Sequence, residues 1–497
     1  MNNFSPFIHL FKTLDNFYIY DVNTNRIIKV EEYVYHYLEY ILAGKSANIE
    51  KTGLIISEEE ILKASYKIKT LQEHGLLSNK RGKKIQHHLD RYLEGILSSC
   101  MENLILQVTQ ACNLRCKYCT YSGDYLNRPH GALSMPEGIA KKAIDFFIAH
   151  SSETPRPAFG FYGGEPFLNF ELIKTLVPYI KKKMRGKQFI FNITTNGTLL
   201  NEEIITFLAT HNVSLMVSLD GPKEVHDLNR CYGSGKGSYD QVMKNIELAK
   251  EIAPEYANKH IMFSSVFTKE ISFCSLTKFF TDFNAIKEPY VIASTPSKFY
   301  LKENQKEKVK NLVYDDDLNY ETFKFFLSKL GRLPESDVSN LLKTWEEQDR
   351  ASMEEKRMEE MELPDILHPG GPCAPGVRRL FVNIKGELYP CERVSESSST
   401  CHIGSLETGI DIHKAKKIMN IGRLTENECL NCWAVKFCGS CVASADNGET
   451  LDKKLKLSYC KDFIANAEGK LIKYCTFKEF NIPTEKQSEM IPFLFIN

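Results

Sequence analysis

Three closely spaced cysteines are the residues of this sequence best suited to chemistry. They occur as Cys112-Asn-Leu-Arg-Cys116-Lys-Tyr118-Cys119, directly after the apolar run Leu104 to Val108, which predicts a buried strand. Three thiolates in one loop can each hold one iron of a four-iron, four-sulfur cube, and the fourth iron then lacks a protein ligand. An open iron of this kind can bind a substrate or a cofactor directly.

A zinc ion is the alternative occupant of the same loop. Structural zinc sites usually combine two pairs of ligands, and catalytic ones often include a histidine. No fourth ligand lies close to the loop, and His130 follows at an unrelated spacing. The motifs further along the chain favour iron and sulfur over zinc.

The composition bounds the class of protein. The 497 residues include 15 cysteines and equal numbers of basic and acidic side chains, 63 of each. A net charge of zero gives no general attraction to nucleic acid or to an anionic membrane. We see no signal peptide and no apolar run of about 18 residues, so we expect a cytoplasmic protein without a membrane partner. In a reducing compartment, clustered cysteines indicate metal binding or catalysis rather than disulfides.

Strands and helices are predicted to alternate between residues 100 and 300. Ser134 and Glu137 are predicted to form a capping box at the start of one helix, and Asn201 is predicted to cap another. Repeated strand–helix units indicate a parallel sheet, whose site forms from the loops at the carboxyl ends of the strands. The predicted strands are 104–108, 158–162, 189–194, 213–219 and 260–267.

Four short motifs follow the predicted strands in order, beginning with the cysteine loop. The others are Gly163-Gly164-Glu165-Pro166, Thr194-Thr195-Asn196-Gly197 and Ser218-Leu-Asp220-Gly221. Any one of them alone is an ordinary turn. In this order they resemble the motifs of radical S-adenosylmethionine enzymes, and the resemblance implies an α/β fold with a partial (β/α)6 barrel.

The resemblance also implies the cofactor contacts. Gly163, Gly164, Glu165 and Pro166 would hold the methionine ammonium, and Thr195, Asn196, Ser218 and Asp220 would contact the ribose and carboxylate. Arg230 would bind the carboxylate, and Tyr118 would pack near the adenine. A flavodoxin- or ferredoxin-type donor would supply an electron, and cleavage of S-adenosylmethionine would give a 5′-deoxyadenosyl radical.

A second group of cysteines begins at Cys373. Its pattern is Cys373-x12-Gly386-x4-Cys391 and, later, Cys429-x2-Cys432-x5-Cys438-x2-Cys441, with Cys460 after eighteen more residues. This resembles the SPASM extension, which implies two auxiliary [4Fe–4S] clusters, although that family usually has three residues before the cysteine at position 441. The implied ligands are Cys429, Cys432, Cys438 and Cys460 for a distal cluster, and Cys373, Cys391 and Cys441 for a proximal one.

The fourth ligand of the proximal cluster stays open. Cys401 or Cys475 would supply it, or one iron would remain free for a substrate thiolate. Structural zinc is the alternative for Cys429 to Cys441.

The first 95 residues predict a separate small domain. Two β-rich runs, 17–21 and 27–30, flank a polar turn, and a helix is predicted from Glu31 to Ala43. Ser57 and Glu60 form a capping box for a second helix, and Leu76-Leu77 is predicted to begin a closing wing. This resembles the winged-helix, PqqD-like domain of peptide maturases, which implies that the leader of a precursor peptide adds a strand to its sheet. A purely structural domain and a DNA-binding winged fold are the alternatives, although the mixed charge weakens the latter.

These resemblances together imply a radical S-adenosylmethionine/SPASM maturase. The segment Tyr121-Ser-Gly123-x-Tyr125-x-x-Arg128-x-His130 resembles maturases of cysteine-rich peptides. The implied reaction forms thioether crosslinks in a ribosomally made peptide, as sactipeptide and ranthipeptide enzymes do. Carbon–carbon crosslinking, formylglycine formation in a sulfatase, and an inactive scaffold or regulator are the alternatives. The predicted divisions are 1–95, the barrel at 100–300, a helical connector at 301–365, the SPASM domain at 366–475 and a tail at 476–497.

Overall fold

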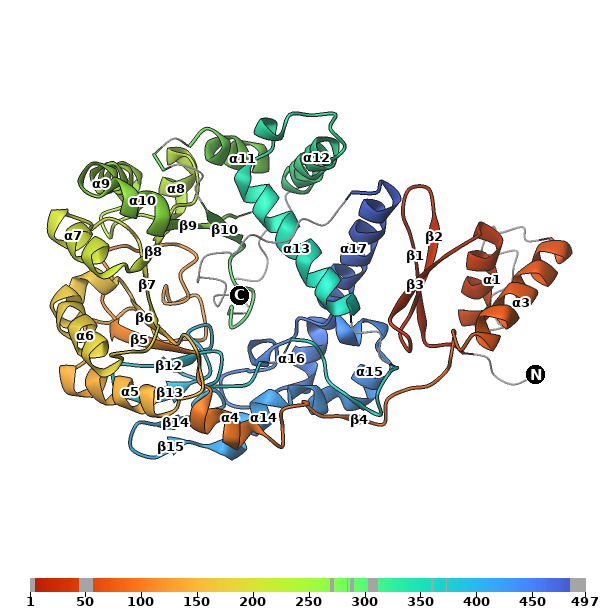
Figure 1. The fold of residues 1–497 in the computed structure, drawn as a ribbon, viewed down its shortest axis with the longest axis horizontal. Helices are drawn as coiled ribbons and strands as arrows, with labels where there is room; N and C mark the ends of the chain where they lie inside the picture. The colour runs from red at the N-terminus through yellow and green to blue at the C-terminus, as the bar shows by residue number, and fades with distance from the viewer. Residues whose placement is uncertain are drawn as a thin grey trace.

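The computed structural model describes residues 5–43, 57–268, 272–283, 285–286, 290–302, 312–358, 362–371 and 373–482. Figure 1 shows a large α/β body joined to a small N-terminal unit by the cysteine-rich region. The predicted tail at 476–497 begins inside helix α17 (Cys460–Glu479), so its first residues are helical. The part of the tail after residue 482 lies outside the described residues. No described helix is both long enough and apolar enough to cross a membrane.

Six parallel strands form the main part of the large sheet. Each strand pairs with the next one along the chain, as repeated strand–helix units require. The strands are β5 (Asn103–Thr109), β6 (Ala158–Gly163), β7 (Ile190–Thr195), β8 (Ser214–Ser218), β9 (Ile261–Val266) and β10 (Val291–Ser294). The parallel sheet expected from the sequence is therefore confirmed.

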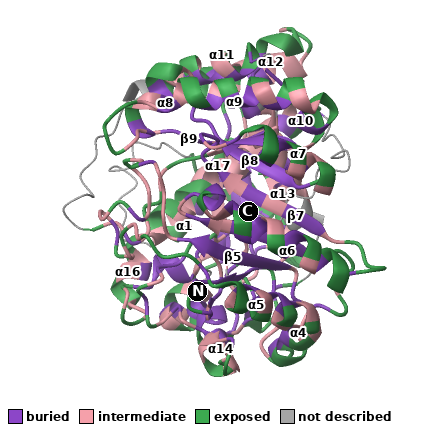
Figure 2. Cartoon of the chain, turned by 90° about the vertical axis from the view of Figure 1, so that its left-hand side faces the viewer, coloured by how far each residue is buried: buried purple, intermediate pink, exposed green. Residues whose placement is uncertain are grey.

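Amphipathic helices cover the outer side of this sheet (Figure 1). In α6 the buried side chains include Leu172, Leu176 and Ile180, which recur at helical spacing and face the strands. Figure 2 shows the same division, with buried strands behind helices whose outer faces are exposed. The helices are α5 (Glu137–Ala149), α6 (Phe170–Lys183), α7 (Glu202–His211), α8 (Lys223–Asn229), α9 (Tyr239–Ile252), α10 (Pro254–His260) and α11 (Phe273–Thr281).

Of the two helix caps predicted between residues 100 and 300, one is correct. The Asn201 side chain accepts a hydrogen bond from the Ile204 N–H at the start of α7. The predicted capping box at Ser134 is wrong: Pro136 precedes the first residue of α5, and no side chain caps that helix. Ser134 instead bridges to Thr109 at the end of β5, so the strand competes successfully for its hydrogen bonds.

The cysteine-rich region extends the same sheet. Strand β12 (Leu380–Val382) lies parallel to β5, and β13 (Glu387–Tyr389), β14 (Gly404–Ser405) and β15 (Gly409–Ile410) continue outward in antiparallel pairs. The second group of cysteines is thus fixed to the strand that carries the first group. The short helices of the region are α14 (Ile412–Met419), α15 (Glu426–Leu430) and α16 (Lys453–Ser458). Helix α4 (Leu93–Ser99), which precedes β5, contacts α14.

In its described residues, 5–43 and 57–95, the N-terminal unit is a three-stranded antiparallel sheet with two long helices. It contains β1 (Ile8–Lys12), β2 (Phe17–Asp21), β3 (Arg26–Val30), α1 (Glu32–Leu42) and α3 (Glu58–Glu73). The predicted hairpin, first helix and Ser57 capping box are confirmed, whereas the sequence did not indicate β1.

The predicted wing at Leu76-Leu77 is wrong. Leu77 has a φ of +56° and donates its N–H to the buried Asp21 carboxylate, so the chain turns there instead of forming a strand. The segment 81–91 is not a plain linker either, because β4 (Lys84–Ile85) pairs with β11 (Ile366–Leu367).

Two long helices connect the barrel to the cysteine-rich region. They are α12 (Leu312–Lys329) and α13 (Asn340–Met358), close to the helical connector expected at 301–365. Lys470 on α17 forms an ion pair with Asp349 on α13, with 2.9 Å between the charged atoms. Figure 1 shows α13 crossing between β10 and α17.

Candidate active site and auxiliary cysteine centres

The first three cysteines occupy the loop after β5. Their thiols lie close enough to influence one another electrostatically, and burial raises the pKa of Cys112 to about 12 and that of Cys116 to about 11. Burial also raises the pKa of Cys119. Such thiols ionise only beside strong positive charge, which bound iron would supply. The donor set therefore fits an iron–sulfur cluster.

The loop after β6 passes very close to the cysteine loop. A Cβ atom on Gly163, whose φ is +153°, would lie 2.1 Å from the Thr109 carbonyl oxygen. A Cβ on Gly164 would lie 2.1 Å from the Ala111 oxygen. Only glycine permits this approach, which lets the Glu165 N–H donate to the Ala111 oxygen at 2.8 Å. The two glycines therefore set the position of the backbone just before Cys112.

Glu165 joins the loops that follow β6 and β7. Its fully buried carboxylate accepts hydrogen bonds from the Thr195 hydroxyl at 2.7 Å and the Asn196 N–H at 2.8 Å. Burial raises the pKa of Glu165 to about 7, although these hydrogen bonds act in the opposite direction. Asn196 also reaches the cysteine loop, where its Nδ2 donates to Asn113 Oδ1 at 2.9 Å.

Asp220 gathers three donors at the end of β8. Its Oδ2 accepts from the Tyr118 hydroxyl at 2.5 Å and from Arg230 Nε at 3.0 Å, and its Oδ1 accepts from the Val266 N–H at 3.0 Å. The Arg230 guanidinium also lies 5.3 Å from the centre of the Tyr118 ring. Tyr118, Asp220 and Arg230, which the sequence assigned to one cofactor, are therefore in direct contact.

His226 helps to position Arg230 through the Ser238 hydroxyl. It is fully buried, its Nε2 lies 2.9 Å from the Ser238 hydroxyl, and that hydroxyl donates to the Arg230 carbonyl at 2.7 Å. Burial lowers the pKa of His226 to about 3, so the ring is neutral at physiological pH. Ser218, another predicted contact, is buried at the end of β8.

The four cysteines proposed for the distal group lie near one another. Cys432, Cys438 and Cys460 each lie within electrostatic reach of Cys429, and burial raises the pKa of these three thiols. The sequence interpretation missed Lys456, which is almost fully buried and has its Nζ 3.8 Å from Cys429 Sγ. Its position four residues before Cys460, on α16 just ahead of α17, was the available signal.

The proximal group contains three cysteines. Cys391 and Cys441 both lie within electrostatic reach of Cys373. Of the two cysteines proposed as a fourth ligand, Cys401 donates its thiol to Asp446 Oδ2 at 3.1 Å, and Cys475 packs in an apolar core with Leu471. The described contacts of these two thiols are therefore with Asp446 and with an apolar core.

The segment after the cysteine loop is tied to the cysteine-rich region by Arg128. Its Nε donates to Glu396 Oε1 at 2.8 Å, and its guanidinium lies 4.0 Å from the centre of the Tyr121 ring. The Gln107 amide donates to the same oxygen of Glu396 at 2.6 Å. The sequence indicated Arg128 but not its partner, which lies 268 residues further along the chain.

Within the residues that the structure describes, no three Cys, His, Asp or Glu side chains are arranged to hold one metal ion. A zinc ion needs its sulfur ligands at about 2.3 Å. A four-iron cluster takes each thiolate on a different iron, so its ligands are further apart.

A family model decides what kind of barrel this is. Residues 106–263, from β5 to β9, match the model of the Radical SAM superfamily. The chain therefore contains a Radical SAM domain. Radical SAM enzymes carry a [4Fe–4S] cluster and use S-adenosylmethionine. The matched domain contains the three cysteines after β5 and the loops around Glu165 and Asp220.

Three curated relatives show how far the similarity extends. The protein MJ0907 of Methanocaldococcus jannaschii is 30% identical over 243 residues, which cover 47% of this chain and 73% of that protein. The cysteine-type anaerobic sulfatase-maturating enzyme of Clostridium novyi is 35% identical over 160 residues, or 31% of this chain and 41% of the enzyme. The radical SAM cyclopropyl synthase TigE of Paramaledivibacter caminithermalis is 28% identical over 180 residues, or 33% of this chain and 35% of the enzyme. The chain thus spans less than half the length of the last two.

Solved structures extend the similarity in fold beyond the barrel. The structure of native anSMEcpe with bound AdoMet aligns with a TM-score of 0.56 at 21% identity, covering 75% of this chain and 99% of that one. The same protein with AdoMet and the Kp18Cys peptide aligns with a TM-score of 0.54 at 20% identity. At these identities the similarity concerns the fold.

Proposed function

We propose that this radical SAM enzyme matures a ribosomally made peptide by forming thioether links from cysteine sulfur to carbon. The observation that supports the proposal best is that Cys373, Cys391 and Cys441 lie near one another. They belong to a region whose strand β12 pairs with β5, the strand that precedes the first cysteine loop. Three thiolates would hold an auxiliary cluster with one open iron, at which a peptide cysteine could be presented. Cys429, Cys432, Cys438 and Cys460 would hold a second auxiliary cluster.

The residues of the barrel would bind and shield the cofactor. When bound, the first cluster and S-adenosylmethionine would supply the radical that removes a hydrogen atom from the peptide. Glu165 would accept the methionine ammonium in its ionised form, and Arg230, held by Asp220, would bind the cofactor carboxylate. The buried walls formed by β5 to β8 would exclude water from the reacting atoms.

The N-terminal unit would hold the leader of the precursor peptide. Its sheet has the order β1-β2-β3, so β3 is an edge to which an extended peptide can add as a strand.

Formylglycine formation is the second candidate. It is favoured by the relatives named as sulfatase-maturating enzymes and by the fold of anSMEcpe with its bound peptide. A carbon–carbon crosslink is the third possible product, and it must be distinguished from a thioether and from formylglycine.

The experiment is the mass of a cysteine-rich candidate peptide after anaerobic reaction with dithionite-reduced enzyme, followed by alkylation of free thiols. We expect a loss of two hydrogens for each thiol protected from alkylation. A loss of two hydrogens with every thiol still alkylated indicates a carbon–carbon link. Conversion of a cysteine in a sulfatase-derived peptide to an aldehyde, with no change in the cysteine-rich peptide, contradicts the proposal.

A further inference from the structure

Tyr162 carries a half-buried side chain near the carboxyl end of β6. Its neighbour Phe161 is buried in the core beneath the outer helices, so Tyr162 lies on the opposite face of the sheet. Tyr162 pairs in register with Gln107 on β5, and the Gln107 amide donates to Glu396 Oε1 at 2.6 Å. Tyr162 therefore lies on the sheet face that meets the cysteine-rich region.

Charged groups and a thiol from several loops surround the Tyr162 hydroxyl. The groups within its electrostatic reach are Glu392, Cys119, Arg393 and Glu396. Burial raises the pKa of Tyr162, so the hydroxyl keeps its proton and can donate a hydrogen bond. Tyr162 is thus close both to the first cysteine group and to the loop after β13.

Each carboxylate near Tyr162 already has an arginine. Arg128 Nε donates to Glu396 Oε1 at 2.8 Å. Arg379 Nη1 donates to Glu392 Oε1, also at 2.8 Å. Arg393 is a further arginine, whose Nε lies 3.8 Å from Glu392 Oε1 and whose side chain is 57% exposed. It therefore adds a positive charge that faces solvent.

Arg393 lies at the proximal cysteine group. Its N–H donates to the Cys391 thiol, and its charge is within electrostatic reach of Cys441. Beside it, Glu392 Oε2 is buried and has no hydrogen-bond partner among the described residues. An exposed cation next to a buried acceptor complements a peptide residue that offers a carboxylate and an N–H.

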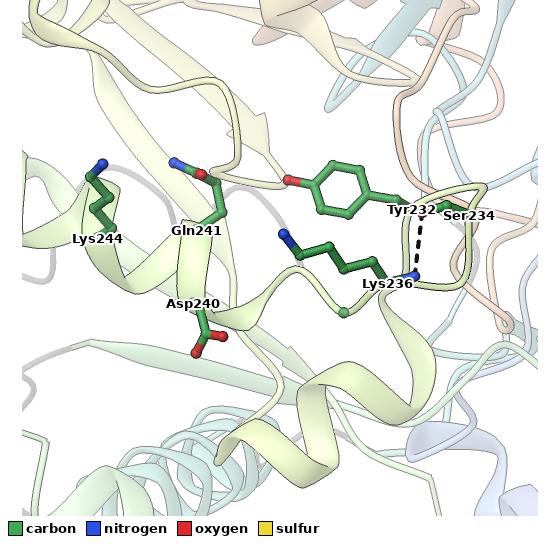
Figure 3. Close-up of a pocket in the computed structure, with 7 residues that line it drawn as sticks. Tyr232, Ser234, Lys236, Asp240, Gln241 and Lys244 are labelled. Carbon is green, nitrogen blue, oxygen red and sulfur yellow. Dashed lines mark hydrogen bonds between the residues drawn. The ribbon is translucent and has the colours of Figure 1, made fainter.

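A cavity of about 440 Å³ on α9 and the hairpin before it also carries exposed cations (Figure 3). Its lining includes Lys236 and Lys244 together with Asp240, and it contains no cysteine. A carboxylate attracted by positive charge alone would also bind there. Lys236 is therefore a matched control for Arg393, because both side chains are exposed cations.

We propose that Arg393 and the Tyr162 hydroxyl bind the carboxylate of an acidic residue beside the cysteine of the precursor peptide. The inference rests on the proposed function, which brings that cysteine to the proximal group. The guanidinium pairs with the carboxylate, Tyr162 donates to it, and Glu392 Oε2 accepts the N–H of the same peptide residue. No covalent bond forms or breaks in this step. The substrate class is a precursor with aspartate or glutamate beside its linked cysteine.

The test is a competition between short synthetic peptides that differ only in the residues flanking one cysteine, which are glutamate, glutamine or lysine. The tagged, reconstituted enzyme is mixed with equal amounts of the three peptides under anaerobic conditions without reductant, and the retained peptides are quantified by mass spectrometry. We expect the wild type to retain the glutamate peptide at least about threefold over the lysine peptide. Arg393→Glu reverses this order, Arg393→Gln abolishes it, and Tyr162→Phe weakens it.

The control Lys236→Glu should keep the wild-type order. A reversal in Lys236→Glu overturns the proposal, as does equal retention of the three peptides by the wild type, and retention no greater than on bare resin counts as equal. An unchanged order in Arg393→Glu also overturns it, as does a shifted midpoint potential of an auxiliary cluster as the only effect of Arg393→Gln. Retention is measured before any reduction, so a correct charge preference without thioether formation counts against the proposed function alone.

Discussion

His9 stacks on Trp433, with the ring centroids 3.6 Å apart and the ring planes 4° from parallel. His9 lies on β1 of the N-terminal unit, and Trp433 directly follows Cys432. The Tyr20 ring lies 5.3 Å from the Phe437 ring, just before Cys438. The N-terminal unit therefore packs directly on the loop that carries two of the proposed distal ligands.

This stacking predicts a pH-dependent stability. Burial lowers the pKa of His9 to about 4 from a usual 6.5, so the folded state favours the neutral ring. The stability is complete above pH 6.5 and falls as the pH drops toward 4. Between pH 7 and pH 5 the loss is about 2 kcal/mol. The Glu468 carboxylate lies 3.8 Å from the His9 Nε2 and would offset part of the loss.

His9→Phe is the matched variant, because phenylalanine keeps an aromatic ring that cannot be protonated. We expect its urea midpoint to change less than that of the wild type between pH 7 and pH 5. Equal pH dependence in the two proteins would contradict the role of His9.

Gly164→Ala should displace the cysteine loop. The added Cβ would meet the Ala111 oxygen at 2.1 Å and Cys112 Cβ at 3.0 Å, and these are backbone and loop atoms that cannot move independently. We expect iron content after anaerobic reconstitution to fall by about four per chain. Gly138→Ala in α5 is the control, since nothing lies within 4 Å of its Cβ. Full iron content in Gly164→Ala would show that the approach is not needed for the cluster.

Lys456→Met should make the proposed distal cluster harder to reduce. The buried ammonium lies 3.8 Å from Cys429 Sγ, and a positive charge there favours the more negative, reduced cluster. Redox titration followed by electron paramagnetic resonance should show a more negative midpoint potential. The exposed neighbour Lys454→Met should leave it unchanged. Identical midpoint potentials in the two variants would show that the Lys456 charge does not influence this centre.

Arg128 and Glu396 form a buried ion pair, with 13% and 4% of their side chains exposed. Arg128→Met should destabilise the fold by about 3–5 kcal/mol, because it leaves the Glu396 charge buried and unpaired. Adding Glu396→Gln removes that charge, so the double variant should recover much of the loss. Urea unfolding of the cluster-free proteins measures both changes. Additive losses in the double variant would indicate that the two side chains do not interact.

Contacts between neighbouring strands were predictable from the sequence. Glu165 and Asn196 follow β6 and β7, which adjoin in any parallel sheet built from consecutive strand–helix units, so their hydrogen bond follows from the order of the motifs. The grouping of Cys429 with Cys460 followed from the family pattern alone. The predicted helix cap at Ser134 failed because a tertiary bridge to Thr109 replaced the local hydrogen bond.

Contacts between distant segments were not predictable. Arg128 and Glu396 meet only because β12 pairs with β5, and no local pattern in either segment signals that pairing. The stacking of His9 on Trp433 likewise depends on how β1 packs against the cysteine-rich region. Long-range packing of this kind depends on the complementarity of whole surfaces, which a periodicity in the sequence does not encode.

The cleavage of S-adenosylmethionine tests the central claim most directly. The wild-type protein and Cys116→Ala are reconstituted anaerobically, reduced with dithionite and analysed for 5′-deoxyadenosine and iron. We expect deoxyadenosine and about twelve irons in the wild type, and no deoxyadenosine with about eight irons in the variant. Continued formation of deoxyadenosine by Cys116→Ala would contradict the assignment of the cluster to Cys112, Cys116 and Cys119.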